Sequence, residues 1–249
     1  MESPAGLPVM RFVAVLAAFG ALAAPAPAAD GPLTLAEAAA MPYAPVVMVV
    51  DTVSSLGPLA AEPQAVTLAD LVRYHGHPCD GLLVAAAGIA EGLKRLFPDG
   101  VVDRTDLVAA VNRSACYGDA AAYLTGARSR YGSLVIDPSL GDEWIVGRRS
   151  TGWSVRVILR AGFKPPELAG MERELRAAAC PAALIAAVQG LQRRFALAVL
   201  AVPPDRAFEV RPLPGFPYPT GEARPDTAKR ACGRVSADQP RRPAPRGNE

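Results

Sequence analysis

The sequence predicts an α+β fold, a single mixed domain in which a twisted sheet packs against apolar helices. Residues 82–96 have the Ala/Leu/Ile pattern of a helix whose first half is apolar on every side, which is typical of a helix inside the core. Strand-like stretches follow one another between residues 134 and 159, and a last strand is expected at 207–213. Helices and strands therefore occur in blocks, without the βαβ alternation of a doubly wound parallel sheet.

Capping and turn residues define the other expected elements. Thr67 and Ser114 are typical N-cap residues, and each precedes a run with helical spacing. The signals together predict a buried strand at 44–51, helices at 68–74 and 115–124, strands at 134–136, 143–147 and 154–159, and a helical stretch at 167–198 with a break at Pro181.

Residues 1–29 have the organisation of an export signal. Arg11 supplies the positive charge, residues 12–24 are an uninterrupted apolar stretch, and small residues at 26–29 precede Asp30. An uncleaved anchor is the alternative, because the stretch approaches the length that spans a bilayer. Its many alanines are only weakly hydrophobic, which favours cleavage. We therefore expect a periplasmic protein with no membrane association after the signal is removed.

The rest of the chain divides into three parts by composition. Residues 30–64 form a mature N-terminal segment, residues 65–213 the α+β domain, and residues 214–249 a Pro/Arg-rich tail that we expect to be disordered. Hydrophobic residues make up 51% of the chain, which suffices for a sizeable core, and the net charge is only +2. No basic stripe is interleaved with aromatic residues, so nucleic acid is not an expected partner.

The two histidines of the chain lie in one five-residue run, His75-Gly76-His77-Pro78-Cys79. Gly76 and Pro78 disfavour a helix there, so we expect an extended run. Side chains in such a run repeat with period two, which places His75, His77 and Cys79 on one side. Two imidazoles and a thiol on one side can converge on a borderline-soft metal ion.

A second cysteine is expected to join this run. Cys79 and Cys116 each lie at the start of an apolar helix, where the helix dipole stabilises a thiolate. If both helices pack in one core with their N-termini close together, Cys116 meets the run. Asp119, one turn after Cys116, has three alternative roles: an outer partner that orients an imidazole, a proton acceptor, or a first-turn capping residue. Asp80 is a second candidate for the outer position.

Zinc is the metal that the predicted ligands His75, His77, Cys79 and Cys116 favour, with copper and iron as alternatives. Two or three protein ligands leave a coordination position open for chemistry, whereas four make the site structural or a carrier. The sequence contains no nucleophile–base pair, phosphate loop or nucleotide fingerprint. The residues alone therefore leave open whether the protein is an enzyme.

Two further functional hypotheses use the same residues. In an oxidising compartment Cys79 and Cys116 can cycle between dithiol and disulfide, and the four cysteines can also form two structural disulfides. The other hypothesis is an accessory module that binds a small molecule or a partner without catalysis. Cys180, in an alanine-rich helix, is interpreted as a small apolar residue, and Cys232 lies in the tail.

From about Thr67 to Leu213 the sequence resembles the FmdE-like family, which is named after a component of formylmethanofuran dehydrogenase. The specific motif is Tyr74-His75-Gly76-His77-Pro78-Cys79-Asp80-Gly81, and weaker ones follow in the family's order: Cys116 to Ala120, Leu124 to Gly126, Gly132 to Leu134, Thr151-Gly152, Val155 to Val157 and Phe208 to Val210. The resemblance implies an α+β core with a metal-binding pocket lined by the His/Cys run and the second cysteine, in many members as a homodimer.

The sequence also departs from the pattern of that family. Asp80 stands where proline is usual, Ala127 replaces a cysteine, and Arg130 to Ser133 replace a glycine-lysine-glycine-asparagine turn. The C-terminal zinc finger of many members is absent, since Cys232 is the only cysteine after Cys180. An exported protein would not meet the cytoplasmic complex after which the family is named. The resemblance therefore implies common ancestry and not that activity.

Overall fold

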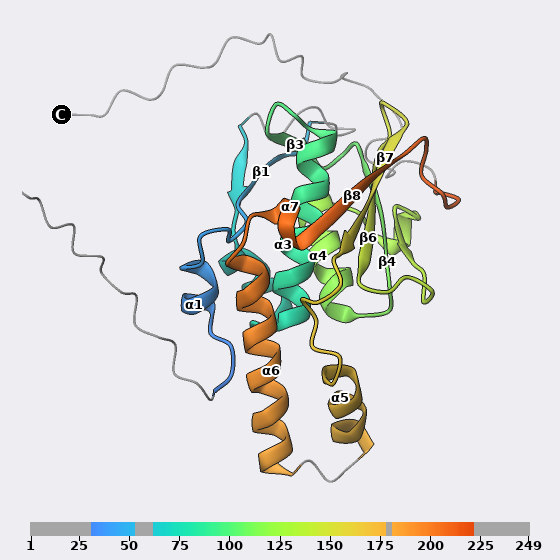
Figure 1. Cartoon of the computed structure of the whole chain (residues 1–249). Coiled ribbons are helices and arrows are strands. Elements are labelled where there is room, and N and C mark those ends of the chain that lie inside the picture. The colour runs from blue at the N-terminus through green and yellow to red at the C-terminus, as the bar shows by residue number, and fades with distance from the viewer. Residues whose placement is uncertain (1–30, 53–61, 178–180, 222–249) are drawn as a thin grey trace, which may run out of the picture.

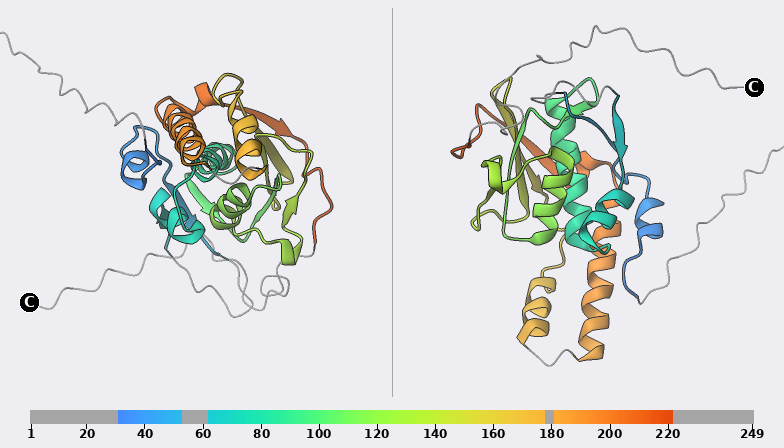
Figure 2. Two further views of the ribbon diagram at one scale, coloured as in Figure 1. Left: turned by 90° about the horizontal axis from the view of Figure 1, so that it is seen from below. Right: turned by 180° about the vertical axis from the view of Figure 1, so that it is seen from behind.

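Helix α3 (Asp80–Leu96) lies at the centre of the fold, between a small and a large sheet (Figures 1 and 2). The computed structural model describes residues 31–52, 62–177 and 181–221. Within these residues the elements occur in the order α1 (Leu35–Ala39), β1 (Val47–Val50), β2 (Gln64–Val66), α2 (Leu68–His75), α3, β3 (Val101–Asp103), β4 (Leu107–Val111), α4 (Ala115–Thr125), the 3-10 turn Ser129–Tyr131, β5 (Leu134–Ile136), β6 (Glu143–Arg148), β7 (Trp153–Leu159), α5 (Leu168–Ala177), α6 (Ala182–Leu200), α7 (Pro204–Ala207) and β8 (Phe208–Leu213).

The large sheet has the strand order β5-β4-β6-β7-β8, and the small sheet has the order β2-β1-β3. In the large sheet β4 and β5 are parallel and the other pairs are antiparallel. The α+β class predicted from the sequence is confirmed. The sequence predicted one sheet, however, and the structure has two, because β1 pairs with β2 and β3 on the other side of α3.

Helix α3 is buried along most of its length because glycines replace side chains where it approaches its neighbours. A Cβ atom on Gly88 would lie 2.8 Å from the ring of Trp144, and a Cβ atom on Gly92 would lie 2.8 Å from Val157 Cγ2. Trp144 is fully buried and also packs against the rings of Tyr117 and Phe208, with centroids 5.0 and 5.9 Å away. The helix thus lies directly against β6 and β7.

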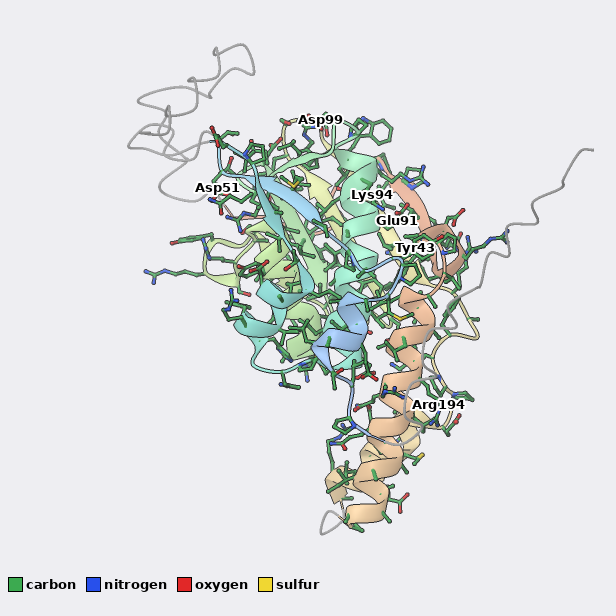
Figure 3. The ribbon with its side chains drawn as sticks, turned by 90° about the vertical axis from the view of Figure 1, so that its left-hand side faces the viewer. Tyr43, Asp51, Glu91, Lys94, Asp99 and Arg194 are labelled. Carbon is green, nitrogen blue, oxygen red and sulfur yellow. The ribbon has the colours of Figure 1, made fainter. Side chains whose placement is uncertain are left out.

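The C-terminal half of α3 is the part of this helix that carries a charged cluster. Glu91 forms ion pairs with Lys94 at 3.5 Å and with Arg95 at 3.8 Å. Figure 3 shows Glu91 and Lys94 on this part of α3, while the apolar N-terminal half continues towards the His/Cys run. The polar end of α3 is therefore the end away from the site described below.

Helices α5 and α6 project beyond the sheets as a pair (Figures 1 and 2). The break predicted at Pro181 is confirmed, since Pro181 is the N-cap residue of α6. By length and composition α6 is apolar enough to cross a membrane, and 44% of its most apolar 18-residue window is buried in the fold. Its buried Arg193 pairs with Glu37 of α1 at 2.6 Å, which ties the N-terminal segment to α6.

Residues 214–221, the first part of the predicted tail, have a defined place in the fold. Disorder was expected from Pro214, but residues 214–221 pack against the large sheet. Phe216 and Tyr218 contact a small apolar cluster that contains Ile145, and the Gly221 N–H donates to the carbonyl of Gly132 at 3.1 Å. These two aromatic rings bury enough apolar surface to hold this segment on the sheet, although the tail as a whole is poor in large apolar residues. Residues 1–30 and 222–249, with the predicted export signal and most of the tail, lie outside the described residues.

We predict that Gly88→Ala destabilises the fold by about 1–2 kcal/mol. Overpacking against Trp144 costs about 1–3 kcal/mol, which exceeds the gain of up to about 1 kcal/mol in helix propensity. Gly170→Ala in α5 is the matched control, because its Cβ would meet only the Arg173 side chain, at 4.0 Å. Urea unfolding measures both variants, and a Gly88→Ala protein at least as stable as the unsubstituted chain would contradict the packing described here.

Candidate metal centre

The His/Cys run joins two helices and is not the extended strand that the sequence predicted. Helix α2 continues to His75, and Gly76 ends it in the left-handed conformation, with φ of +103° and its N–H bonded to the carbonyl of Val72 at 2.8 Å. Cys79 is then the N-cap residue of α3. Gly76 and Pro78 do exclude a continuous helix, but the chain uses them to turn between two helices.

The first turns of α3 and α4 meet at the two cysteines. Cys79 and Cys116 are free thiols whose sulfur atoms lie 3.2 Å apart. A Cβ atom on Gly81 would lie 3.0 Å from Cys116 Cβ and 3.2 Å from its sulfur, which is tighter than ordinary packing allows. Since glycine has no Cβ, Gly81 permits this close approach of the two helix starts.

His75 completes a compact group with the two cysteines, which we call the metal group. Its Nε2 atom lies 3.6 Å from Cys79 Sγ, and the nitrogen and both sulfur atoms lie within 4.8 Å of one another. Its Nδ1 atom lies 2.7 Å from a carboxylate oxygen of Asp119. Because a carboxylate accepts hydrogen bonds, this contact favours a ring proton on Nδ1 and leaves Nε2, the atom nearest to Cys79 Sγ, as the nitrogen that can bind a metal.

Two other residues predicted for the site lie next to the metal group but outside it. The ring of His77 packs beside that of His75, with centroids 4.7 Å apart, and its side chain is exposed. Asp80 is buried at the start of α3, and burial raises the pKa of its carboxyl to about 7. Both residues line the cavity next to the metal group.

The two thiols have opposite pKa shifts. The pKa of Cys116 is lowered to about 5, mainly by the hydrogen bond from the Cys79 thiol and also by Ser114 and His75, which together outweigh the opposing effect of burial. The same contact with Cys116, together with burial, raises the pKa of Cys79. Without a metal the pair therefore holds one thiolate, on Cys116, and one thiol, on Cys79. A bound cation would displace the remaining proton.

The ligand types of the metal group suit a borderline-soft ion, and the distance between its two sulfur atoms is close to the one that such an ion needs. Two thiolates and an imidazole are a common zinc ligand set, and a carboxylate on the second ring nitrogen is the usual outer partner of a zinc-bound histidine. With metal–sulfur bonds of about 2.3 Å, two sulfurs on a tetrahedral ion lie about 3.8 Å apart. The two sulfur atoms are 3.2 Å apart in the structure, so they would have to move apart by only about half an ångström to bind a metal ion.

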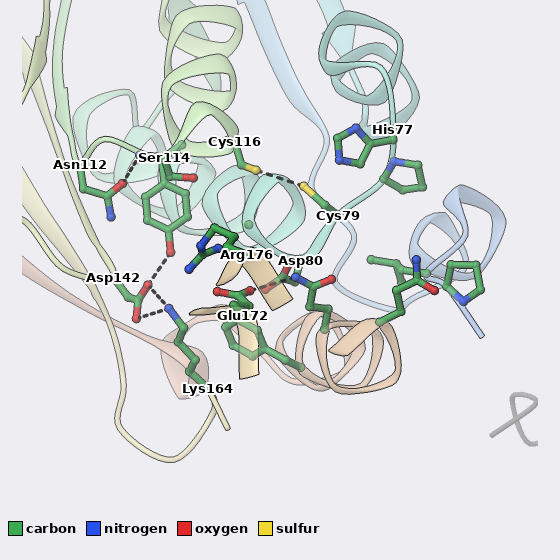
Figure 4. Close-up of a pocket in the computed structure, with 18 residues that line it drawn as sticks. His77, Cys79, Asp80, Asn112, Ser114, Cys116, Asp142, Lys164, Glu172 and Arg176 are labelled. Atoms are coloured by element: carbon green, nitrogen blue, oxygen red, sulfur yellow. Dashed lines mark hydrogen bonds and ion pairs between the residues drawn. The ribbon is translucent and has the colours of Figure 1, made fainter. Parts of the chain in front are cut away.

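A polar cavity of about 700 Å³ lies against the metal group (Figure 4). Both cysteines face it, so a molecule in this cavity would lie next to the two thiols. On the far wall Tyr117 donates a hydrogen bond to Asp142 at 2.6 Å, and Lys164 pairs with the same carboxylate at 2.9 Å. Glu172 on α5 accepts a hydrogen bond from Gln192 on α6 at 3.0 Å.

The sequence did not predict these residues as part of the site. Tyr117 alone carried a local signal, its position directly after Cys116. Asp142, Lys164 and Glu172 come from a loop before β6, a loop after β7 and helix α5, and only the packing of those elements brings them to one cavity.

Comparisons with known proteins agree with the resemblance noted in the sequence. Residues 74–209, more than half of the chain, match the family model described as "FmdE, Molybdenum formylmethanofuran dehydrogenase operon". No curated protein matches the chain. Among solved structures, the chain is similar to a tungsten formylmethanofuran dehydrogenase FmdE-like protein from Syntrophus aciditrophicus, with 20% identity, a TM-score of 0.38, and coverage of 60% of this chain and 71% of that chain.

The pKa shift predicts that Cys116 of the metal-free chain reacts as a thiolate in acid. Because its pKa is lowered, the thiolate fraction rises through about pH 5 and is nearly complete at pH 7, whereas an ordinary thiol titrates near about 8.5. Alkylation by iodoacetamide, followed for each cysteine by peptide mass spectrometry, measures this midpoint. Cys79→Ala removes the donated hydrogen bond and should move the midpoint up. A wild-type midpoint near about 8.5 would refute the assignment.

Proposed function

The chain belongs to the FmdE family, and from this premise we propose that it binds one divalent transition metal ion through His75, Cys79 and Cys116. The observation that carries the proposal is the metal group itself: three ligand atoms within 4.8 Å of one another, from two helix starts and the end of a third helix. Asp119 supports it by holding the imidazole in the tautomer that a metal needs.

Zinc is the proposed metal. Two thiolates with one imidazole suit a borderline-soft ion, and zinc has no electronic preference for geometry that would exclude these three donors. Copper binds the same ligand types at least as strongly and is the main competitor, followed by iron. The distinction between them rests on measured metal content of protein purified from its own cells.

Three protein ligands leave one coordination position, which we propose faces the polar cavity. A zinc ion there would supply a Lewis acid. The chain's own residues would do the rest: Asp119 keeps the proton on His75 Nδ1, and the pair of Asp142 and Lys164 presents charges of both signs to a bound molecule. The exposed His77 at the cavity wall is the candidate for the fourth ligand if the site closes.

Metal analysis of the purified chain tests the proposal. We expect about one zinc per chain, near-complete loss in His75→Ala and in Cys116→Ser, and an affinity about 10–100 times weaker in Asp119→Asn, because this substitution removes the carboxylate that orients His75. Circular dichroism shows whether each variant is folded. Cys232→Ser is the control, since the proposal does not use this cysteine.

His77→Ala separates the three-ligand site from a closed one. Retained metal supports an open position, whereas loss of metal shows that His77 is a ligand, as the sequence alone suggested. A wild-type chain without metal refutes the proposal.

A thiol-redox protein is the second candidate function, because the two sulfurs are already 3.2 Å apart. In that reaction the Cys116 thiolate attacks a disulfide of a partner protein, and Cys79 then displaces the mixed disulfide, which leaves a Cys79–Cys116 disulfide and two thiols on the partner. A stable Cys79–Cys116 disulfide in metal-free protein supports this function. Bound zinc with two unoxidised thiols supports metal binding.

We further propose that the protein works in the periplasm, as the first 29 residues suggest. Expression of the chain in a bacterium with two membranes should place it in the periplasmic fraction, with a new N-terminus near Asp30. Substitution of Leu16 and Leu22 by charged residues in the apolar stretch should retain the protein in the cytoplasm. Cell fractionation measures the location and N-terminal sequencing measures the cleavage. An intact N-terminus in the cytoplasmic fraction of the unsubstituted chain would contradict export.

A further inference from the structure

A second cavity, which we call the α4 groove, runs along the outer face of α4. It has a volume of about 740 Å³ and shares only Ser114 with the lining of the polar cavity. Its floor is the side of α4 with small residues at helical spacing, Ala115, Gly118 and Ala122. A Cβ atom on Gly118 would have no atom within 4 Å, so this face is left uncovered by the described part of the chain. The opposite face of α4 is buried in the core.

The charge of the α4 groove is positive. Arg113 precedes α4 and Arg128 follows it, and both side chains are exposed walls of the groove without an ion-pair partner among the described residues. The acidic groups of the groove are already engaged: Asp51 pairs with Arg104 at 3.0 Å, and Asp119 accepts a hydrogen bond from His75. Two arginines therefore remain free to meet an anion.

An aromatic wall adds a second element of recognition. Tyr74 on α2 and Tyr123 on α4 line the groove with their rings 5.3 Å apart, and Tyr74 is 55% exposed although its ring is large. Arg104, which also lines the groove, holds the backbone of this wall, because its guanidinium donates to the carbonyl of Tyr123 at 3.3 Å. Exposed rings next to free arginines can bind a planar ring by stacking and its acidic group by ion pairing.

We propose that the α4 groove is a binding site for a small anionic molecule that carries a planar ring together with a phosphate or carboxylate group. The ring lies on the wall made by Tyr74 and Tyr123, and the acidic group is bound by Arg113 or Arg128. The floor of small residues provides the depth for such a molecule.

The groove also reaches the metal group through Asp119. Asp119 lines the groove and bonds to His75, so a molecule bound there contacts the carboxylate that orients a proposed metal ligand. This coupling rests on the proposed function, whereas binding in the groove does not. If both hold, the bound anion and the metal change each other's affinity by the same factor.

Calorimetric titration of the 249-residue chain with phenyl phosphate tests the site. Cyclohexyl phosphate lacks the planar ring and phenol lacks the charge, so both should bind more weakly than phenyl phosphate. Arg113→Gln and Arg128→Gln should together weaken phenyl phosphate about tenfold or more. Arg130→Gln is the matched control, an exposed arginine two residues away that does not line the groove. Tyr74→Leu should reduce the preference for phenyl over cyclohexyl phosphate.

The same titration of Cys116→Ser separates the groove from the metal, because this variant keeps every residue of the groove. Binding that persists in Cys116→Ser supports the groove even if the chain holds no metal. Binding that is lost in Cys116→Ser but retained in the double arginine variant assigns the phosphate to a metal and overturns the proposal. No heat from phenyl phosphate up to about 10 mM, or equal loss in Arg130→Gln, overturns it as well.

Discussion

The contact between the first turns of α3 and α4 is the constraint on which the rest of this structure depends. Gly81 makes it sterically feasible, since a Cβ atom there would lie 3.0 Å from Cys116 Cβ, closer than ordinary packing allows. Farther along α3, Gly88 and Gly92 let the same helix lie against β6 and β7. One helix with glycines on its contact faces thus packs on the large sheet and on α4 at once, and the two cysteines meet as a consequence.

Helix α4 serves several purposes because its faces point to different surroundings. Cys116 lies against Cys79, Tyr117 points to the polar cavity and packs on Trp144, and Asp119 holds His75 from the other side. Three directions around one helical turn therefore connect the metal group, the polar cavity and the α4 groove. Asp119 belongs both to the lining of the groove and to the support of His75, which is why the groove variants at Arg113 and Arg128 leave it unchanged.

The sequence predicted the longer helices well, did not predict α1, β2, β3, β4 or α7, and was wrong about the run that joins α2 to α3. Residues with helical periodicity and caps, such as those of α3 and α4, were placed within a few residues of their observed bounds. For His75 to Cys79 the glycine and proline were interpreted as signs of a strand, whereas Gly76 ends α2 and Cys79 starts α3. A strand would have placed His77 with His75 and Cys79; the turn between helices places its ring outside the metal group.

By itself the sequence determined the fold class, the family resemblance and the chemistry available to the site, because these follow from residue types, spacing and the rarity of histidine. The tertiary structure alone decided which donors converge, that Asp119 orients His75, and that Asp142, Lys164 and Glu172 share a cavity with the two thiols. The physical reason is that local periodicity reports on a single helix or strand. Distances between atoms of different elements depend on how closely those elements pack, and here that closeness depends on single glycines.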